Sequence, residues 1–283
     1  MSHYDGHARV IGGGTDLLLE IQQGHSPVVE AMVDTSRISG LDRITIEDEH
    51  IVIGCAVTHT QIVHDETIIR HGTCLVESCG VIGGPQVRNV ATLAGNVAHA
   101  MPAGDGSIGL LALDGEIEVA DANGCRWMPL QEAYLGPGKS AIDHHRAILT
   151  RLRFRPTASA EGSAFTRVMR PQGVALPMIS MAARLQLDDA NNISALRISL
   201  GPAGPVPYLA EAAMEELTGG PAGVEQFKKA AESVLASAPL RDSKYRATRE
   251  YRVEMIRTHL PLILTRAAER ARSGHAVPEG VGL

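Results

Sequence analysis

Two glycine-rich stretches carry the residue types that an anion-binding site requires. Ile11-Gly12-Gly13-Gly14-Thr15-Asp16 lies near the start of the chain, and Ala91-Thr92-Leu93-Ala94-Gly95-Asn96 lies further along. Glycines let backbone N–H groups approach a phosphate without a Cβ in between, and the hydroxyls of Thr15 and Thr92 can donate hydrogen bonds to its oxygens. Either stretch alone is typical of a tight turn with a helix cap. Together they predict the two halves of one anion cradle.

The elements around these stretches support that prediction. Ala8 to Ile11 has the pattern of a short buried strand, and Thr15 to Gln23 has the apolar run of a helix that ends at Gly24. A strand, a glycine turn and a helix in that order are typical of phosphate binding. The second stretch belongs to a long segment, Ile82 to Asp105, that is rich in Gly, Asn, Thr and Pro but has few charges and no apparent regular structure. Such a segment usually packs around a ligand.

Composition excludes several classes of protein. The chain has 283 residues, of which 44% are hydrophobic and 20% charged, and its formal net charge is -6, so it offers no basic field for nucleic acid or anionic lipid. It contains no apolar run of about 18 residues that could span a bilayer, and its first residues lack the pattern of a signal peptide, so we expect a cytoplasmic protein. Its 4 cysteines are too few for a disulfide framework.

Length and patterning predict two domains. At roughly 150 residues per domain, an α/β domain is expected over residues 1–155 and a smaller α+β domain over residues 163–273, followed by a tail, 274–283. Pro156 to Gly162 has the composition of a linker. Further strands of the first domain are predicted at Val28–Val33, Arg43–Ile46, Ile51–Ile53, Glu116–Ala120, Cys125–Met128 and Ala147–Phe154, and further helices at Thr58–Ile69, Thr73–Val81 and Gly106–Leu113.

The second domain is predicted to be an antiparallel meander followed by helices. Alternating apolar residues indicate strands at Phe165–Met169, Met178–Leu187 and Ile193–Leu200. Helical periodicity follows at Tyr208–Leu217, Val224–Leu235 and Ser243–Ala271. Pro261 should kink or split the last helix, because proline removes a backbone donor from a helix interior.

Four other patterns resemble functional motifs but lack the required context. Gly104 to Gly109 fits G-x-G-x-x-G, yet no strand leads into it as a dinucleotide site requires. Gly136-Pro137-Gly138-Lys139-Ser140 resembles the end of a P-loop without the first glycine of that motif. The spacing of His71, Cys74 and Cys79 matches no metal site, so buried structural thiols are the preferred interpretation. His144-His145 is interpreted as part of a solvated loop.

The two glycine stretches resemble those of the FAD-binding subunit of the molybdenum hydroxylases, the family of xanthine dehydrogenase, carbon monoxide dehydrogenase and the aldehyde oxidoreductases. Gly12 to Leu17 is similar to the family's A-G-G-T-D-L, and Gln86 to Asn96 is similar to its Q-I-R-N-x-x-T-x-G-G-N. The similarity extends to Asp242–Arg246 and Glu250–Arg252 near the C-terminus. It implies a two-part FAD-binding domain of the PCMH-like type, followed by a small α+β domain with a three-stranded antiparallel sheet and helices.

The resemblance implies that FAD is the cofactor and that both stretches contact it. The first stretch would wrap its pyrophosphate and ribityl chain, and the second would contact the same cofactor. Because carboxylates repel phosphate, Asp16 and Asp105 would face hydroxyl groups or a helix N-terminus instead. The residues expected to bind FAD are Arg9, Val10, Ile11, Gly12, Gly13, Gly14, Thr15, Asp16, Leu17, Thr92, Gly95, Asn96, His99, Asp105 and Leu149.

The chain departs from the family pattern in three places. Relatives usually carry a helix before the first glycine stretch, whereas Gly12 comes almost at once here. Ala94 replaces the usual first glycine of the G-G pair, so the backbone there must tolerate a Cβ. Arg170 to Gly173 and Pro177 stand where related chains often carry basic residues near the flavin ring. The contacts of that ring therefore stay open.

The function implied by the resemblance is that of an oxidoreductase subunit without catalytic or metal-binding residues of its own. Electrons would pass from iron–sulfur clusters on a small partner subunit through FAD to an external acceptor such as NAD, a quinone or oxygen. The molybdenum cofactor would sit on a large partner subunit. Consistently, the chain has no cysteine set for a cluster. Two alternatives stay open: a stand-alone FAD-dependent oxidase of an alcohol or hydroxy acid, and a flavin-free scaffold subunit.

Overall fold

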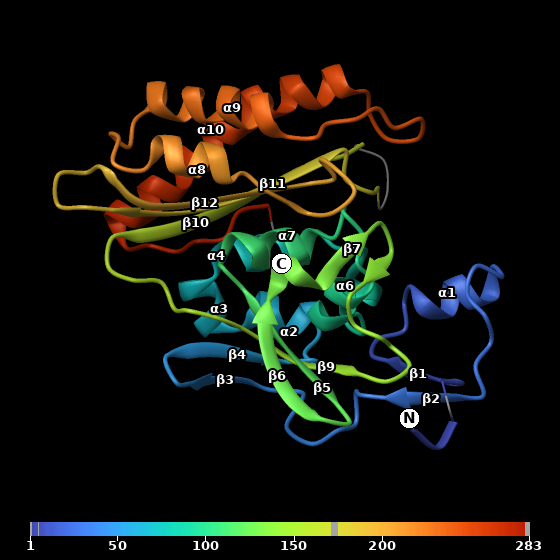
Figure 1. Ribbon diagram of the computed structural model, residues 1–283. Coiled ribbons are helices and arrows are strands. Elements are labelled where there is room, and N and C mark those ends of the chain that lie inside the picture. Colours follow the sequence, from blue (N-terminus) through green and yellow to red (C-terminus); the bar gives the residue numbers. More distant parts are fainter. Residues whose placement is uncertain (1, 5, 171–174, 281–283) are drawn as a thin grey trace.

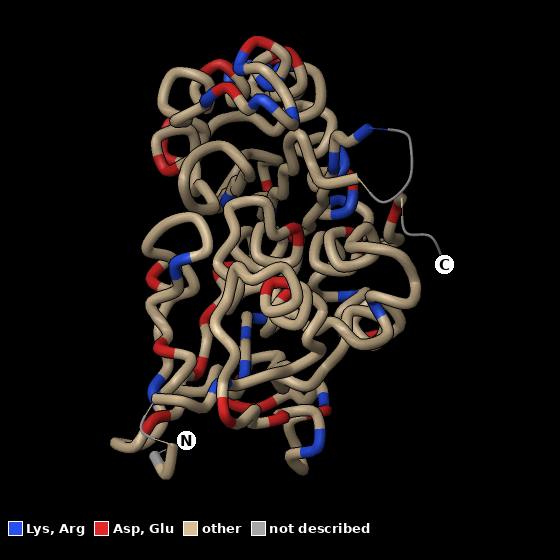
Figure 2. Tube along the Cα trace, turned by 90° about the vertical axis from the view of Figure 1, so that its right-hand side faces the viewer, with Lys and Arg blue, Asp and Glu red and all other residues tan. Residues whose placement is uncertain are grey.

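The computed structural model describes residues 2–4, 6–170 and 175–280. From bottom to top in Figure 1 lie a five-stranded antiparallel sheet, a layer of short helices, a second antiparallel sheet and a layer of longer helices. Acidic and basic residues are spread over both halves of the molecule (Figure 2). This arrangement confirms the expected mixture of α/β and α+β structure. Among the described residues, no helix is long and apolar enough to cross a membrane.

The first glycine stretch lies in a small unit at the side of the molecule. A 3-10 turn at Ser2–Tyr4 precedes β1 (Ala8–Ile11), which pairs in parallel with β2 (Ala31–Asp34). Between them lies α1 (Leu17–Gln22), none of whose residues is buried. The predicted order of strand, glycine turn and helix is confirmed.

The lower sheet is built from two hairpins with one strand inserted between them. Its strand order is β3-β4-β9-β5-β6, and all neighbouring strands are antiparallel. The predicted strands pair as two hairpins, β3 with β4 and β5 with β6, and Gly124 takes a positive φ of 121° at the turn of the second hairpin. The strands are β3 (Ile44–Glu47), β4 (His50–Gly54), β5 (Glu116–Asp121), β6 (Gly124–Pro129) and β9 (Ile148–Phe154).

The helices above this sheet differ from the prediction in two ways. The segment predicted as one helix from Thr58 to Ile69 is two helices, because Asp65 caps the second one with its side chain. The segment from Ile82 to Asp105, expected to lack regular structure, contains two short helices and that expectation was wrong. The helices are α2 (His59–His64), α3 (Glu66–His71), α4 (Thr73–Gly80), α5 (Pro85–Arg88), α6 (Leu93–Ala98) and α7 (Asp105–Ala112).

Short elements connect α7 and the lower sheet to the second half of the chain. A 3-10 turn at Leu130–Ala133 leads into β7 (Tyr134–Gly136), which pairs with β8 (Lys139–Ser140). The hairpin turns at Gly138, which has a positive φ of 66° and donates its N–H to the carbonyl of Ala100 at 3.0 Å. That N–H is therefore not free for a phosphate, which supports rejecting the P-loop interpretation.

The second sheet confirms the predicted three-stranded meander and adds a short fourth strand. Its order is β10-β11-β12-β13, with antiparallel pairing throughout. Three helices cover its upper face in Figure 1. The elements are β10 (Glu161–Val168), β11 (Ile179–Leu187), β12 (Ile193–Gly201), β13 (Tyr208–Leu209), α8 (Glu211–Leu217), α9 (Val224–Ser237) and α10 (Arg249–Ser273).

Helix α10 runs without interruption through Pro261, so of the two expected effects of this proline, a kink or a split, the split is wrong. The helix also begins later than predicted, because the side chain of Thr248 accepts a hydrogen bond from the N–H of Tyr251 and caps it there. Leu260 and Ile263, on either side of the proline, are buried in the core. Packing on both sides of Pro261 stabilises the helix against the loss of one backbone hydrogen bond.

Candidate functional site

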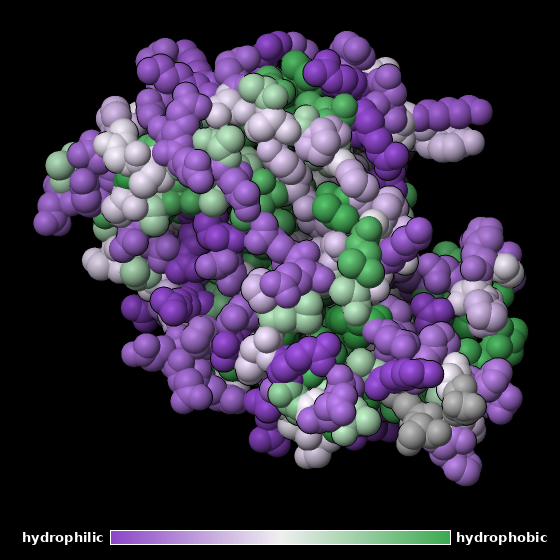
Figure 3. All heavy atoms as spheres, viewed as in Figure 1, coloured by the Kyte–Doolittle hydropathy of each residue, from purple (hydrophilic) through white to green (hydrophobic). Residues whose placement is uncertain are grey.

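A cavity of about 520 Å³ lies between the first glycine stretch and helix α6. This volume is typical of small-molecule sites. The cavity is lined by residues from both halves of the chain, and Figure 3 shows a notch between the upper half and the region of α1. It brings together all the residues predicted to bind the cofactor: Arg9, Val10, Ile11, Gly12, Gly13, Gly14, Thr15, Asp16, Leu17, Thr92, Gly95, Asn96, His99, Asp105 and Leu149.

The first glycine stretch presents a row of free backbone donors to this cavity. Among the described residues, no acceptor bonds the N–H groups of Gly12, Gly13, Gly14 or Thr15. Gly14 has a positive φ of 71°, which turns the chain at this point. Backbone N–H groups that are partly withdrawn from water need acceptors, and successive ones in a turn form a concave anion site. The row therefore suits the oxygens of a phosphate.

The two glycine stretches touch each other through their backbones. A Cβ on Gly13 would lie 2.0 Å from the carbonyl oxygen of Val90, and a Cβ on Gly12 would lie 3.3 Å from Oγ1 of Thr92. No side chain can be accommodated at 2.0 Å from a carbonyl oxygen. Glycine at position 13 is thus required for the packing of the two stretches, a purpose that the sequence pattern did not reveal.

In the second stretch, Thr92 caps α6 and so changes what Gly95 can do. Oγ1 of Thr92 accepts a hydrogen bond from the N–H of Gly95 at 3.0 Å. The expectation that Gly95 exposes a free N–H donor is therefore wrong. A Cβ at Gly95 would meet only Oγ1 of Thr92, at 3.1 Å, so this glycine keeps the cavity open. Ala94 lies in the right-handed helix α6, whose backbone tolerates its Cβ.

Asn96 is oriented by the start of α7. Its Oδ1 accepts hydrogen bonds from N–H and Oγ of Ser107, at 3.0 and 3.1 Å. The amide group that remains can donate into the cavity. A Cβ on Gly104 would lie 2.8 Å from Oδ1 of Asn96, and one on Gly106 would lie 3.2 Å from it. Contact with Asn96 explains Gly104, and contact with Cδ1 of Leu93 at 2.8 Å together with Asn96 explains Gly106. Helix α7 begins at Asp105 without a preceding strand.

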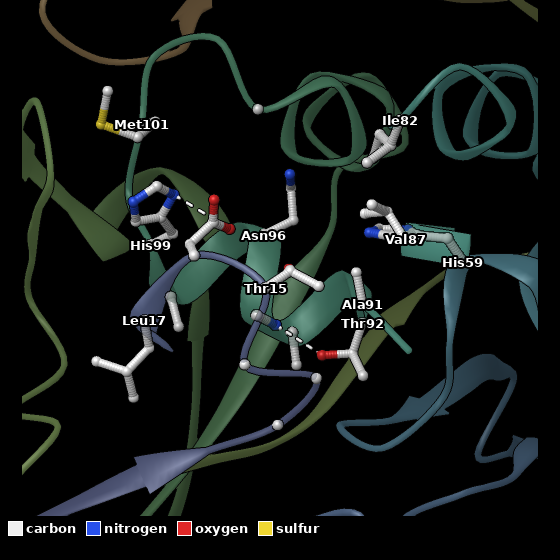
Figure 4. Close-up of a pocket in the computed structure, with 18 of the residues that line it drawn as sticks. Thr15, Leu17, His59, Ile82, Val87, Ala91, Thr92, Asn96, His99 and Met101 are labelled. Atoms are coloured by element: carbon white, nitrogen blue, oxygen red, sulfur yellow. Dashed lines mark hydrogen bonds and ion pairs between the residues drawn. The ribbon is translucent and has the colours of Figure 1, made fainter. Parts of the chain in front are cut away.

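Two of the expected cofactor contacts pair with each other across the mouth of the first stretch. Nε2 of His99 lies 3.0 Å from Oε1 of Glu20, and its Nδ1 lies 3.5 Å from Oδ2 of Asp16. Because Glu20 belongs to α1, these contacts connect α1 to the end of α6. They fix the position of the cavity wall on this side (Figure 4).

Asp105 is buried and already paired within the protein. Its Oδ2 lies 3.0 Å from Nη1 of Arg167, and its Oδ1 accepts a hydrogen bond from Oγ of Ser180 at 2.6 Å. Burial raises the pKa of Asp105 to about 6, although Arg167 acts in the opposite direction. The carboxylate thus forms part of the cavity wall together with its arginine.

His59 is a cavity residue that the sequence analysis missed. The side chain is 1% exposed, and its Nδ1 has no hydrogen-bond partner among the described residues. Burial and then Arg88 lower its pKa to about 4, so the imidazole is neutral near pH 7. Figure 4 shows the ring pointing toward the open space from the wall opposite Asn96. Two long-range contacts place it there: the bridge between Thr58 and Thr92, and the hydrogen bond from the N–H of His59 to the carbonyl of Ala91 at 3.0 Å.

Two histidines near the cavity and two cysteines of α4 are less exposed to solvent than most polar side chains. His144 lines the cavity and burial lowers its pKa, while His145 makes a ring hydrogen bond with the carbonyl of Ala8 at 2.8 Å, so the expectation of a solvated pair is wrong. Burial of Cys74 and Cys79 is confirmed. No group of three potential metal ligands occurs within the described part of the chain.

Part of the segment that stands where related chains carry basic residues reaches the cavity. Pro177 lines the cavity, whereas residues 171–174 lie outside the described residues. The cavity also includes Arg246, from the segment before α10. The family resemblance covers Asp242 to Arg246 but did not assign Arg246 to the cofactor site.

Comparison with known proteins assigns this chain to a family. Residues 1–156 match the family described as the FAD binding domain in molybdopterin dehydrogenase, and residues 163–267 match the CO dehydrogenase flavoprotein C-terminal domain. The xanthine dehydrogenase FAD-binding subunit of Escherichia coli O157:H7 is 31% identical over 266 residues, which are 93% of this chain and 90% of that protein. The nicotinate dehydrogenase FAD-subunit of Eubacterium barkeri is 29% identical over 222 residues, which are 77% of this chain and 74% of that protein.

A solved structure shows the same fold. The carbon monoxide dehydrogenase from Hydrogenophaga pseudoflava that lacks the Mo-pyranopterin moiety has a chain that matches with a TM-score of 0.85 at 23% identity, over 97% of this chain and 93% of that one. The free amides of the first stretch and the open space beside Gly95 fit the phosphates of a dinucleotide. The chain therefore belongs to the family of FAD-binding subunits of molybdopterin dehydrogenases, and FAD is its cofactor.

Proposed function

We propose that this chain holds FAD in the cavity described above and transfers electrons within a molybdenum hydroxylase complex. Electrons would arrive from iron–sulfur clusters on a small subunit and leave for an external acceptor, which is NAD, a quinone or oxygen. The observation that carries the proposal is the row of unbonded amides from Gly12 to Thr15 that faces the cavity. The names of the relatives, which are FAD subunits of dehydrogenases, support it further.

The residues of this chain would bind and orient the cofactor rather than transform a substrate. FAD supplies storage for two electrons when it is bound. The amides of the first stretch would donate to its pyrophosphate, with the hydroxyl of Thr92 and the amide group of Asn96 as further donors. Asp16 and Asp105 would remain in the wall, held by His99 and Arg167. Arg9, Val10, Ile11, Leu17 and Leu149 would enclose the remainder.

We propose partner subunits because the described part of this chain offers no site for a metal ion or an iron–sulfur cluster. Within the described part of the chain, no set of cysteines or other ligands could hold a cluster or a metal ion. The molybdenum cofactor and the iron–sulfur clusters would thus belong to a large and a small subunit. Within this chain, we propose an FAD-binding domain over residues 1–155, an α+β domain over residues 163–273 and a tail over 274–283. The matched ranges, 1–156 and 163–267, support these boundaries.

An absorption spectrum of the purified full chain, with mass identification of the released cofactor, tests this proposal. The expected result is one FAD per chain, flavin bands and no iron–sulfur absorbance. Co-purification from the native source should then yield the two partner subunits. A flavin that is reduced by an alcohol or hydroxy acid without partners would favour the stand-alone oxidase. A protein that stays colourless with added FAD, alone and in its complex, would favour the scaffold.

A further inference from the structure

One end of the cavity carries a positive charge that the protein does not compensate. Asp105, Arg167 and Arg246 line this end, where the two halves of the chain meet. Arg167 and Asp105 form an ion pair of 3.0 Å, with 6% and 5% of their side chains exposed. Their charges cancel. Arg246 adds a second cation to the same end.

Arg246 has no counter-charge of its own. Among the described residues, no carboxylate forms an ion pair with its half-buried guanidinium, and no acceptor receives a hydrogen bond from it. The carboxylate that acts on it electrostatically is Asp105, which is already paired with Arg167. Burial lowers the pKa of Arg246, followed by repulsion from Arg241. A partly desolvated cation without a partner costs free energy, so an anionic occupant of the cavity would relieve that cost.

The backbone holds Arg246 in place before any ligand arrives. The N–H of Ser243 donates to the carbonyl of Ala247 at 3.0 Å, and the N–H of Arg246 donates back to the carbonyl of Ser243 at 3.3 Å. Oδ1 of Asp242 accepts a hydrogen bond from the N–H of Arg249 at 2.7 Å. This closed turn before α10 fixes the backbone from which the side chain of Arg246 reaches the cavity.

The chemistry of the two cavity ends indicates which ring of FAD lies near Arg246. Toward β9 the wall includes the uncharged side chains of Cys55, Ala147 and Leu149, which suit the smaller adenine. The other end combines an apolar wall with the charged groups around Arg246; the apolar side chains there are Ile82, Val87 and Leu176. The three-ring flavin has an apolar dimethylbenzene side and a polar pyrimidine side. It therefore fits the end that offers both.

We propose that Arg246 stabilises the negative charge that the flavin ring gains on reduction, and so raises the reduction potential of the bound FAD. This inference rests on the proposed function, since it requires FAD in this cavity. Uptake of two electrons and one proton leaves the ring with one additional negative charge. An uncompensated cation in a poorly hydrated site interacts with that charge far more strongly than with the neutral oxidised ring. The effect is thus on the potential more than on binding of oxidised FAD.

A reductive titration of the FAD-loaded full chain with dithionite, followed by absorbance against reference dyes, tests this role. Arg246→Gln and Arg246→Met both remove the charge, so the second variant serves if the first fails to fold. We expect each to lower the equilibrium ratio of reduced to oxidised FAD at least tenfold at a given potential, a shift of about 30 mV for a two-electron couple. Arg246→Lys, which keeps the charge, should stay close to the wild-type potential.

Arg249→Gln is the matched control, because it removes the same charge from an exposed position three residues further along. It should leave the potential unchanged. The inference is overturned if the charge-free variants keep the wild-type potential, if they weaken binding of oxidised and reduced FAD equally, or if Arg249→Gln shifts the potential as much. A wild-type chain that binds no FAD, alone or in its complex, overturns the proposed function itself and this inference with it.

Discussion

The glycines of the two stretches serve different physical purposes, and the difference decides what a substitution does. Gly13 lies where a Cβ would meet the carbonyl of Val90 at 2.0 Å, so any side chain there must push the two stretches apart. Gly95 faces open space apart from Oγ1 of Thr92 at 3.1 Å. A side chain at position 95 would therefore grow into the cavity. Substitution at Gly13 tests the fold, whereas substitution at Gly95 tests the cofactor site.

We expect Gly95→Val to leave a folded chain that binds FAD at least tenfold more weakly, equivalent to about 1.4 kcal/mol. The branched side chain would occupy volume that the cofactor needs, while α6 tolerates it at a small cost in helix propensity. Fluorescence quenching of added FAD measures the affinity, and circular dichroism checks the fold. Gly223→Val is the control, because Gly223 has an extended backbone and nothing within 4 Å of an added Cβ. Wild-type FAD affinity in Gly95→Val would refute this assignment.

His59 predicts how the stability of the cofactor-free chain depends on pH. Its pKa is about 4 in the folded state against an ordinary value of 6.5, because burial disfavours the charged ring. The unfolded state therefore binds the proton more tightly. Stability from the neutral ring is complete above pH 6.5 and is lost as the pH falls toward 4, by up to about 3 kcal/mol.

Urea unfolding of wild type and His59→Gln at pH 7 and pH 4.5 measures this contribution as a difference between the two proteins. The comparison is needed because Asp105, whose pKa is raised to about 6, acts in the opposite direction as the pH falls. We expect wild type to lose more stability than His59→Gln. His25→Gln, at an exposed site, should behave like wild type. Parallel losses in wild type and His59→Gln would contradict the prediction.

At the scale of elements, Glu77 joins α4 to the second half of the chain. The side chain is 1% exposed, and its Oε2 accepts a hydrogen bond from the N–H of Phe165 at 2.7 Å. Its Oε1 accepts bonds from Nη2 of Arg270 at 2.6 Å and from the N–H of Glu279 at 2.9 Å. One carboxylate thus holds β10, α10 and the tail against α4.

We expect Glu77→Ala to lower the free energy of unfolding by about 3–5 kcal/mol, because it leaves Arg270 buried without its counter-charge. Chemical denaturation measures the change. The double variant Glu77→Met/Arg270→Met should be less destabilised than Glu77→Ala, since it removes both charges. Glu232→Ala, at the exposed pair with Arg257, should have a much smaller effect. If Glu77→Ala were no worse than Glu232→Ala, the ion pair would not stabilise the contact between the halves.

Local patterns predicted most of the helices and strands but not which of them pack together around the cavity. The hairpin at Gly124 and the meander of the second half were predictable because turn residues and alternation are local signals. Helices α5 and α6 were missed because glycine-rich composition concealed Pro85 at the first helical position and the cap at Thr92. Gly95 and Asn96, which line the cavity from α6, were predictable from the second glycine stretch. His59 and Arg246 were not, because only tertiary packing brings them to the cavity.

At the scale of the whole molecule, the second sheet is shared by both halves. Along β10 and β11 alternate side chains enter different cores: Phe165 and Ala182 pack with the N-terminal core, whereas Ala164 and Ala183 pack with the C-terminal one. In Figure 1 the helices α4 and α7 lie below this sheet and α8 to α10 above it. If the N-terminal half separated from this sheet, the apolar side chains on the face that it covers would be exposed to water.

This sharing predicts that the full chain unfolds in one cooperative transition and that FAD stabilises all of it. If the N-terminal half unfolded alone, Phe165 and its neighbours would lose their packing, so the two cores should melt together. Added FAD at 100 times its Kd should stabilise the whole chain by about 2.7 kcal/mol. Scanning calorimetry with and without FAD measures both effects, and ADP-ribose, which lacks the flavin ring, serves as the partial ligand. Two separate transitions, of which only one responds to FAD, would show that the halves fold independently despite the shared sheet.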